Sequence, residues 1–201
     1  MTTRIKKTIA LIGIVILIAL FAGSLPVLAE IVQGTHIYLP IVLKAEAPGD
    51  IDNPGFEEGQ TGWTFYHNYG AQIVTNMLKH SGQNSARLGS DSLNNLNSYI
   101  SQQVVVPNGQ YMLSYWHYID SQETYCPEFT RYDYVSIQIN GDEVDFYDLC
   151  DDGSVVNRTW VNYRVNLFGY QGQNVSLKVY YLNDATIVSD FFVDDFTFEY
   201  P

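Results

Sequence analysis

Turn-forming residues divide most of the chain into short segments, and this spacing limits the folds open to it. From Asp52 onward, clusters such as "NPG" at 53–55, "PNG" at 107–109 and "DDG" at 151–153 recur about every ten residues. Between them lie runs rich in Tyr, Val, Ile and Phe, which favour strands. No segment there sustains the 3.6-residue period of an amphipathic helix. The pattern predicts an all-β domain.

Three runs in this region alternate apolar and polar residues: "YVSIQIN" at 134–140, "WVNYRVNL" at 160–167 and "VSLKVYYL" at 175–182. Successive side chains on a strand point to opposite faces, so each run would bury one face and expose the other. We therefore predict a two-sheet antiparallel β-sandwich of the jelly-roll type. The expected core residues are Val135, Ile137, Ile139, Val161, Tyr163, Val165, Leu167, Val175, Leu177, Val179 and Tyr181.

Residues 1–29 have the layout of a secretory signal peptide. Three basic residues precede the uncharged apolar run 9–22, and Pro26 is followed by small residues that end at Ala29. The alternative is an uncleaved membrane anchor, because the uncharged stretch 8–29 is long enough to span a bilayer. We expect cleavage and a secreted, extracellular protein.

Residues 30–51 are predicted to form an extended lead-in and linker before a jelly-roll module at 52–201. The lead-in contains the short apolar segment "HIYLPIVLK" at 36–44, followed by "AEAPGD" at 45–50, which has the composition of a linker. The apolar segment has two interpretations, an added edge strand or a tether.

Removal of the signal would leave 7 basic and 22 acidic residues, a net charge of −15. Such a charge repels nucleic acid and anionic lipid, so we expect neither nucleic acid nor, after signal cleavage, membrane as a partner. The remaining chain is long enough for one domain with a stable core.

The two cysteines, Cys126 and Cys150, flank a predicted hairpin. Its turn is Asn140–Gly141, a strong hairpin signal. An even pair of cysteines in an exported protein favours a disulfide, and the four histidines are too scattered to favour a metal–thiolate site. The bridge would close the open end of the hairpin and contribute roughly 3 kcal/mol on the loop-entropy model.

The last strand, within "SDFFVDDFTFEY" at 189–200, contains two adjacent acids. Strict alternation places Asp194 on one face with Phe192, Phe196 and Phe198. A carboxylate among phenylalanines is unfavourable unless it is hydrogen-bonded, paired or bound to a metal. Asp194 therefore needs a partner, and Asp195 is expected to face solvent.

Five segments occur in an order that resembles the galactose-binding-like jelly-roll modules, especially bacterial carbohydrate-binding modules. The adhesive MAM domain is a relative of the same plan. The resemblance covers about residues 52–200, and each segment alone is a weak signal. The segments are "NPGFEEGQTGW" at 53–63, "HSGQNSARLG" at 80–89, "VVVPNGQYMLSYW" at 104–116, "LFGYQGQNVSLKV" at 167–179 and "FFVDDFTFEY" at 191–200.

The resemblance implies a structural calcium ion near the ends of the module. Its ligands would be Glu57, Asp194 and oxygens of the loop Ser81–Ser85, with Asn53, Ser81 and Asn84 in the set. Calcium prefers six to eight oxygen ligands, which suits carboxylates and carbonyls. The alternative is that Asp194 accepts backbone N–H groups without an ion.

Outward-facing aromatic residues are the candidates for ligand binding. Alternation in "YMLSYWHYID" at 111–120 and in the 160–167 run turns Trp, Tyr, Asn and Arg side chains outward. Such a face suits a glycan, because rings stack on aromatic side chains while amides and guanidinium groups bind hydroxyls. The alternative is that loops or the lead-in cover it. The candidate carbohydrate-binding residues are Trp116, Tyr118, Trp160, Asn162 and Arg164, whereas Trp63 is expected in the core.

We expect a protein that is not an enzyme, because the sequence has no G-x-S-x-G, no H-E-x-x-H and no phosphate-binding glycine loop. The leading hypothesis is an exported carbohydrate-binding module with a structural Ca²⁺ and a polysaccharide or surface glycan as partner. The alternative is a cell-surface adhesion or protein-interaction domain of the MAM or protease-accessory type, which would use loops. A hydrolase built on some pair of the many acids is disfavoured by the missing nucleophile or base motif.

Overall fold

The computed structural model describes residues 51–127, 130–151 and 158–201. The predicted signal peptide and lead-in therefore lie outside the described residues, apart from Ile51. Within the described part, no helix has the length and apolar character needed to cross a bilayer.

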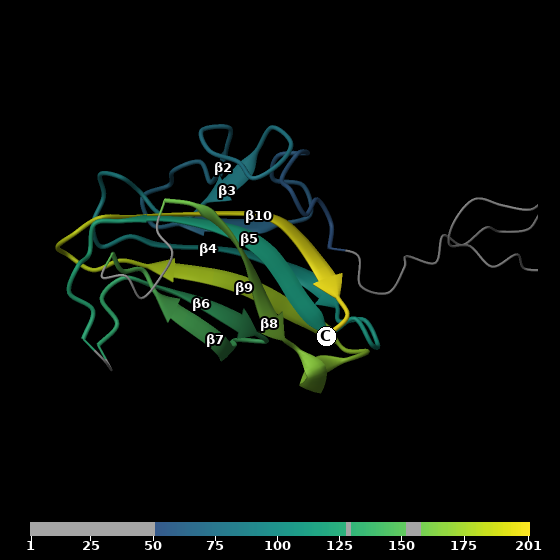
Figure 1. The fold of residues 1–201 in the computed structure, drawn as a ribbon. Helices are drawn as coiled ribbons and strands as arrows, with labels where there is room; N and C mark the ends of the chain where they lie inside the picture. Colours follow the sequence, from purple (N-terminus) through teal and green to yellow (C-terminus); the bar gives the residue numbers. More distant parts are fainter. Residues whose placement is uncertain (1–50, 128–129, 152–157) are drawn as a thin grey trace, which may run out of the picture. The chain divides into compact units, whose positions relative to one another are not determined.

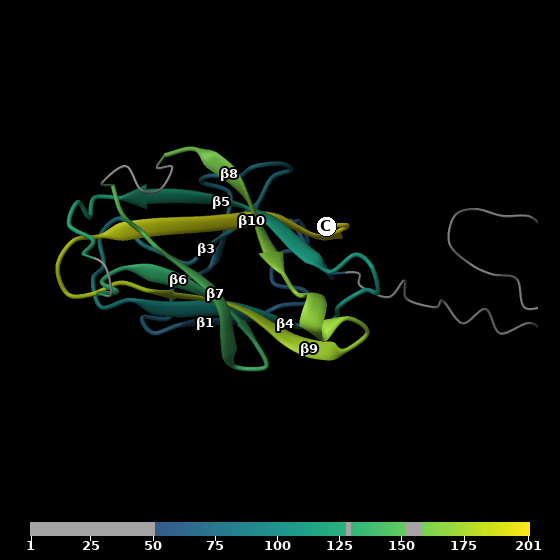
Figure 2. The ribbon, with the colours of Figure 1, turned by 60° about the horizontal axis from the view of Figure 1, so that its bottom comes forward.

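Two five-stranded antiparallel sheets pack face to face in the described residues (Figures 1 and 2), as the sequence predicts. The first sheet has the order β1 (Thr64–His67), β4 (Asn97–Val105), β9 (Asn174–Leu182), β6 (Tyr134–Ile139) and β7 (Asp142–Asp148). The second has the order β2 (Val74–Thr75), β3 (Ser85–Arg87), β10 (Ser189–Glu199), β5 (Met112–Ser121) and β8 (Trp160–Asn166). A short 3-10 helix, η1 (Phe168–Tyr170), precedes β9.

The core lies between the sheets and contains the inward residues of the alternating runs. Val135, Ile137 and Ile139 of β6 have no exposed surface, and the predicted inward residues of β9 are equally buried. Trp63 is also in the core, as predicted, and its ring centroid lies 5.1 Å from that of Phe196. The core is therefore formed by the inward residues of strands that alternate with a period of two, together with a few aromatic residues from loops.

The β6–β7 hairpin and the disulfide are confirmed. The turn residues Asn140 and Gly141 have φ values of 55° and 92°, the positive values that a tight two-residue hairpin turn of type I′ requires. Cys126 and Cys150 are bonded, and the bond ties the segment before β6 to the segment after β7.

Strand β10 departs from strict alternation at its two adjacent acids. Asp194 pairs with Trp116, but the next pair is Thr197 with Ser114, so β10 carries one extra residue, and Asp195 has a φ of 50°. This β-bulge turns Phe196 to the core and leaves Asp194 on the outer face. The prediction that Asp194 shares a face with Phe196 and Phe198 is therefore wrong, because it assumed unbroken alternation.

His117 is a polar residue on the inner face of β5. It is 5% exposed, and its ring lies 5.2 Å from Tyr147 and 5.5 Å from Tyr163 between ring centroids. Its Nδ1 has no hydrogen-bond partner within the described residues. Burial lowers the pKa of His117 to about 4, so the folded protein holds this imidazole in its neutral form at pH 7.

Replacement of His117 by Phe should remove an acid-sensitive contribution to stability. The unfolded chain takes up a proton at His117 near pH 6.5, whereas the folded protein does so only near pH 4. Wild-type stability relative to His117→Phe should therefore fall by about 3 kcal/mol between pH 7 and pH 4. Urea unfolding of both proteins at several pH values measures this difference.

The comparison of the two proteins is needed because other groups act in the opposite direction. Burial raises the pKa of Asp133 and of Asp194 to about 6, so acidification between pH 6 and pH 4 favours the folded state at these residues. Both carboxylates are present in both proteins and cancel in the difference. A difference that does not change with pH would contradict the neutral, buried state of His117.

Candidate functional site

The five predicted carbohydrate-binding residues lie together on the outer face of the second sheet. Tyr118 of β5 is paired with Trp160 of β8, and Trp116 with Asn162. Arg164 follows on the same face, opposite Ser114. The alternation that placed these side chains outward is therefore confirmed.

Several of these side chains are already engaged. The His80 ring stacks on Trp116 with a centroid separation of 3.8 Å and an interplanar angle of 11°. Asn162 donates a hydrogen bond to the Ser114 hydroxyl at 2.8 Å, and Arg164 pairs with Glu199 at 3.2 Å. One ring face of Trp116 is thus covered by a loop residue, as the alternative interpretation of this sheet face had allowed.

A second set of aromatic side chains, which the sequence analysis missed, crosses the outer face of the first sheet. Cross-strand pairing aligns Tyr66, Tyr99, Tyr180, Ser136 and Phe146, one from each of the five strands. Tyr134, two residues before Ser136 on β6, lies beside Tyr180 with ring centroids 6.2 Å apart. We call Tyr66, Tyr99, Tyr180, Tyr134 and Phe146 the aromatic row.

A polar row runs beside the aromatic row. The same pairing aligns Thr64, Ser101, Lys178, Gln138 and Glu143, again one from each strand. These side chains offer two hydroxyls, an ammonium group, an amide and a carboxylate. The outer face of the first sheet therefore presents a line of rings next to a line of hydrogen-bonding groups.

Contacts within this face hold the rings in place. Tyr66 and Tyr99 are stacked at 5.2 Å and 17°. The Lys178 ammonium lies 4.7 Å from the Tyr99 ring centroid, and the Arg131 guanidinium lies 3.6 Å from that of Phe146. The two ends of the row stay accessible, since Tyr66 is 43% exposed and Phe146 is 41% exposed.

The predicted metal ligands Glu57 and Asp194 converge on one loop, residues 80–84. The Asp194 carboxylate is fully buried and accepts hydrogen bonds from the backbone N–H groups of His80 at 2.9 Å and Ser81 at 3.3 Å. The Glu57 carboxylate accepts the N–H groups of Gln83 and Asn84, each at 2.9 Å. The loop thus turns N–H groups toward both carboxylates.

The neighbouring acid Asp195 and the predicted metal ligand Asn53 have separate partners. Asp195, expected to face solvent, accepts the Ser81 hydroxyl at 2.9 Å and lies 2.7 Å from His80 Nδ1. Asn53 donates to the carbonyl groups of Gly59 and Thr61 in its own turn. Among the described residues, no three His, Cys, Asp or Glu side chains are grouped as metal ligands.

No protein-family model and no curated protein match this chain. A solved family 61 carbohydrate-binding module, in complex with β-1,4-galactotriose, is 17% identical with a TM-score of 0.50, and the match covers 77% of this chain and 100% of that chain. The K3 cleaved adhesin domain of Lys-gingipain from Porphyromonas gingivalis is 13% identical with a TM-score of 0.52, over 74% of this chain and 96% of that chain. These likenesses confirm the β-sandwich fold that the sequence resemblance implied.

Two glycine substitutions distinguish the effect of the Glu57–loop contact on stability from the effect of backbone strain. Gly82 and Gly59 have φ values of 58° and 65°, so alanine is strained at both, by about 1–2 kcal/mol. A methyl group at Gly82 would overlap the Glu57 carboxylate, whereas no atom of the described residues lies within 4 Å of one at Gly59. Gly82→Ala should therefore lower the unfolding free energy by about 1–2 kcal/mol more than Gly59→Ala, measured by urea unfolding.

A Glu57→Ala background tests the cause of that difference. Without the carboxylate, Gly82→Ala and Gly59→Ala should destabilise the protein equally, because only backbone strain remains. If the extra effect of Gly82→Ala persists in this background, the contact between Glu57 and the 80–84 loop does not hold the loop.

Proposed function

We propose that the protein is an exported, non-catalytic module that binds a polysaccharide or cell-surface glycan on the outer face of its first sheet. The observation that carries this proposal is the aromatic row beside the polar row. Binding sites for such ligands combine apolar or aromatic surfaces with a few placed polar groups. Here the rings would stack on sugar rings, while Ser101, Lys178 and Gln138 would bind their hydroxyls.

The dimensions of the row favour a chain rather than a single sugar. Five neighbouring strands, spaced about 4.8 Å apart, give a row about 19 Å long that runs across the strands. The net charge, −12 for the full chain and −15 after removal of the signal, disfavours strongly acidic polymers, so we propose a neutral glycan. The disulfide fits an oxidising, extracellular location.

The outer face of the second sheet is a second candidate glycan surface. Tyr118 and Trp160 are half-buried neighbours there, with ring centroids 5.7 Å apart. A ligand that stacked on the covered ring face of Trp116 would first have to displace His80. We therefore place the main site on the aromatic row.

Adhesion through loops is the alternative function, and one exposed aromatic residue favours it. Tyr125 is 68% exposed, adjoins Cys126 of the disulfide and lies 6.5 Å from the Tyr132 ring. A rigidly tethered, exposed aromatic side chain is a suitable anchor for a protein partner. This function would not require the aromatic row.

The calcium ion implied by the sequence resemblance is also a proposal. Glu57 and Asp194 would hold it, and their convergence on the 80–84 loop supports this choice of residues. Burial raises the pKa of Asp194 to about 6, and a nearby cation would favour its charged form. The alternative is that the backbone N–H groups that face both carboxylates hold them without an ion.

Removal of one ring from the row should weaken glycan binding. Tyr180→Ala is expected to lower the affinity for a retained polysaccharide at least tenfold, about 1.4 kcal/mol, since Tyr180 is central to the row. Affinity electrophoresis against galactan, xylan and amorphous cellulose measures the effect, with Trp160→Ala as the matched control on the other sheet. Equal retention of wild type and Tyr180→Ala would contradict the proposed site, and loss only in Trp160→Ala would assign binding to the second sheet.

A calcium ion that binds only the folded protein should raise its thermal midpoint by mass action. We expect the midpoint to fall in chelator and to recover with Ca²⁺ better than with Mg²⁺, whose small octahedral shell suits such a site poorly. Asp194→Asn should abolish most of the Ca²⁺-dependent shift, and Asp195→Asn should keep it. An unchanged wild-type midpoint in chelator, with no metal by elemental analysis, would leave both carboxylates held by backbone N–H groups alone.

A further inference from the structure

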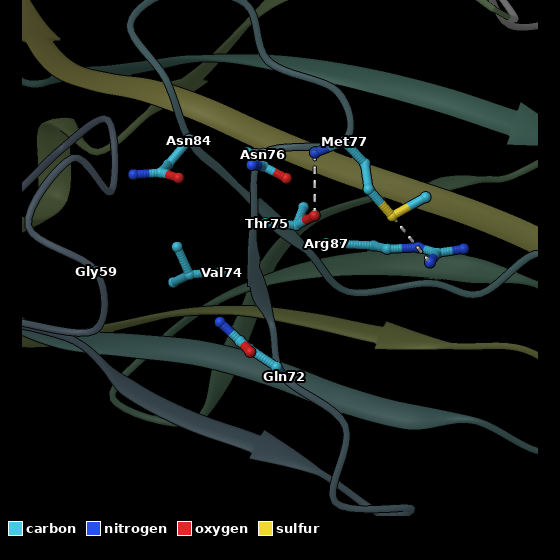
Figure 3. A pocket seen from close by; sticks show the side chains of 8 residues that line it. All are labelled: Gly59, Gln72, Val74, Thr75, Asn76, Met77, Asn84 and Arg87. Carbon is cyan, nitrogen blue, oxygen red and sulfur yellow. Dashed lines mark hydrogen bonds between the residues drawn. The ribbon is translucent and has the colours of Figure 1, made fainter.

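A pocket of about 440 Å³ lies at the β2–β3 edge of the second sheet, whereas the strands that carry the aromatic row belong to the first sheet. Three side-chain amides line it, from Gln72, Asn76 and Asn84, together with the apolar side chains of Val74 and Met77. Figure 3 shows these groups around the space beside β2, with Arg87 close to Met77.

The polar groups of the pocket are available to a ligand. Within the described residues, none of the three amide side chains forms a hydrogen bond; Asn84 uses only its backbone N–H, which it donates to Glu57. Arg87 Nη1 donates to the Met77 sulfur at 3.8 Å, its one hydrogen bond to the part of the chain that the structure describes. Each amide can both donate and accept hydrogen bonds, as hydroxyl groups do.

The charge of Arg87 is already balanced, which argues against an anionic ligand. Its guanidinium pairs with Asp190 at 2.6 Å and with Asp91 at 3.1 Å. The pocket therefore combines neutral donors and acceptors with an apolar wall, at a volume typical of small-molecule sites. That combination matches a neutral polyhydroxylated molecule, whose C–H face can lie on Met77, which is 65% exposed.

We propose that this pocket is a second binding site, which takes one or two units of a neutral saccharide. The choice of ligand class rests on the proposed function; the site itself does not, because its residues are separate from the aromatic row. The protein would then bind a glycan chain on the first sheet and a short saccharide at the edge of the second.

An NMR titration of the ¹⁵N-labelled exported protein tests the proposal. The probes are the methyl β-glycosides of galactose, glucose and xylose. At least one should shift the backbone amides of residues 72–77 and 84–87 with saturation. Asn76→Ala/Asn84→Ala should weaken this binding at least tenfold, because two of the three amides are lost while the Asn84 backbone bond to Glu57 is retained.

The matched control is Gln83→Ala, which alters an exposed neighbour that does not line the pocket and should leave binding unchanged. Asn76→Trp should also abolish binding, by filling the pocket without removal of a core contact. Arg87 is unsuitable as a test, since its loss would strand the buried Asp190 charge.

The outcomes separate this proposal from the proposed function. Shifts confined to the aromatic row, or no shifts at high millimolar glycoside, would overturn the pocket proposal whether or not polysaccharide is retained. Pocket shifts that the double variant abolishes, in a protein that retains no polysaccharide, would support the pocket and contradict binding on the aromatic row.

Discussion

The extra residue in β10 determines how the centre of the second sheet is built. Strand β10 lies between β3 and β5, so its register fixes the faces of both neighbours. The bulge lets Val193 and Phe196 both face the core and leaves Asp194 outside that core, against the 80–84 loop. Burial of the Asp194 carboxylate is unfavourable, and the N–H groups of His80, Ser81 and Asp195 offset the loss of water.

The carboxylates in turn position the groups that line the second sheet. Asp194 and Asp195 hold His80, which stacks on Trp116, and Glu57 holds Asn84, which lines the pocket. Both second-sheet candidates therefore depend on how the 80–84 loop is held. The aromatic row involves none of these residues, because pairing within the first sheet alone aligns it. Loss of the loop contacts would change the second-sheet sites while the row stays intact.

Much of the fold could be predicted because local patterns determine it. Alternation assigned the inner faces of β5, β6, β8 and β9, and the turn at Asn140–Gly141 and the cysteine pair defined one hairpin and its closure. The bulge could not be predicted in this way, since no glycine marks it. Asp195 adopts a positive φ itself, which its short polar side chain tolerates better than most.

The aromatic row was missed for a different reason. Tyr66, Tyr99 and Tyr180 are distant in sequence, and each is only one outward residue on its own strand. Cross-strand register, which the sequence pattern does not specify, brings them into line. The tryptophans of the second sheet stood out in the sequence because Trp is a strong marker of binding surfaces.

Preorganisation is the physical reason to prefer the aromatic row over the face that contains Trp116. Ligand binding is weakened when flexible side chains must be ordered or existing contacts broken. On the row, Tyr66 and Tyr99 already support each other, and Lys178 already lies over a ring next to the polar row. On the other face, the His80–Trp116 stack and the Arg164–Glu199 pair would have to give way before a sugar could use the same groups. The row has internal contacts of its own, since Arg131 lies over Phe146 and pairs with Glu143. The proposed site would still keep its rings in place for a ligand, because the Tyr66–Tyr99 stack leaves Tyr66 43% exposed and no described loop residue has to be displaced from it.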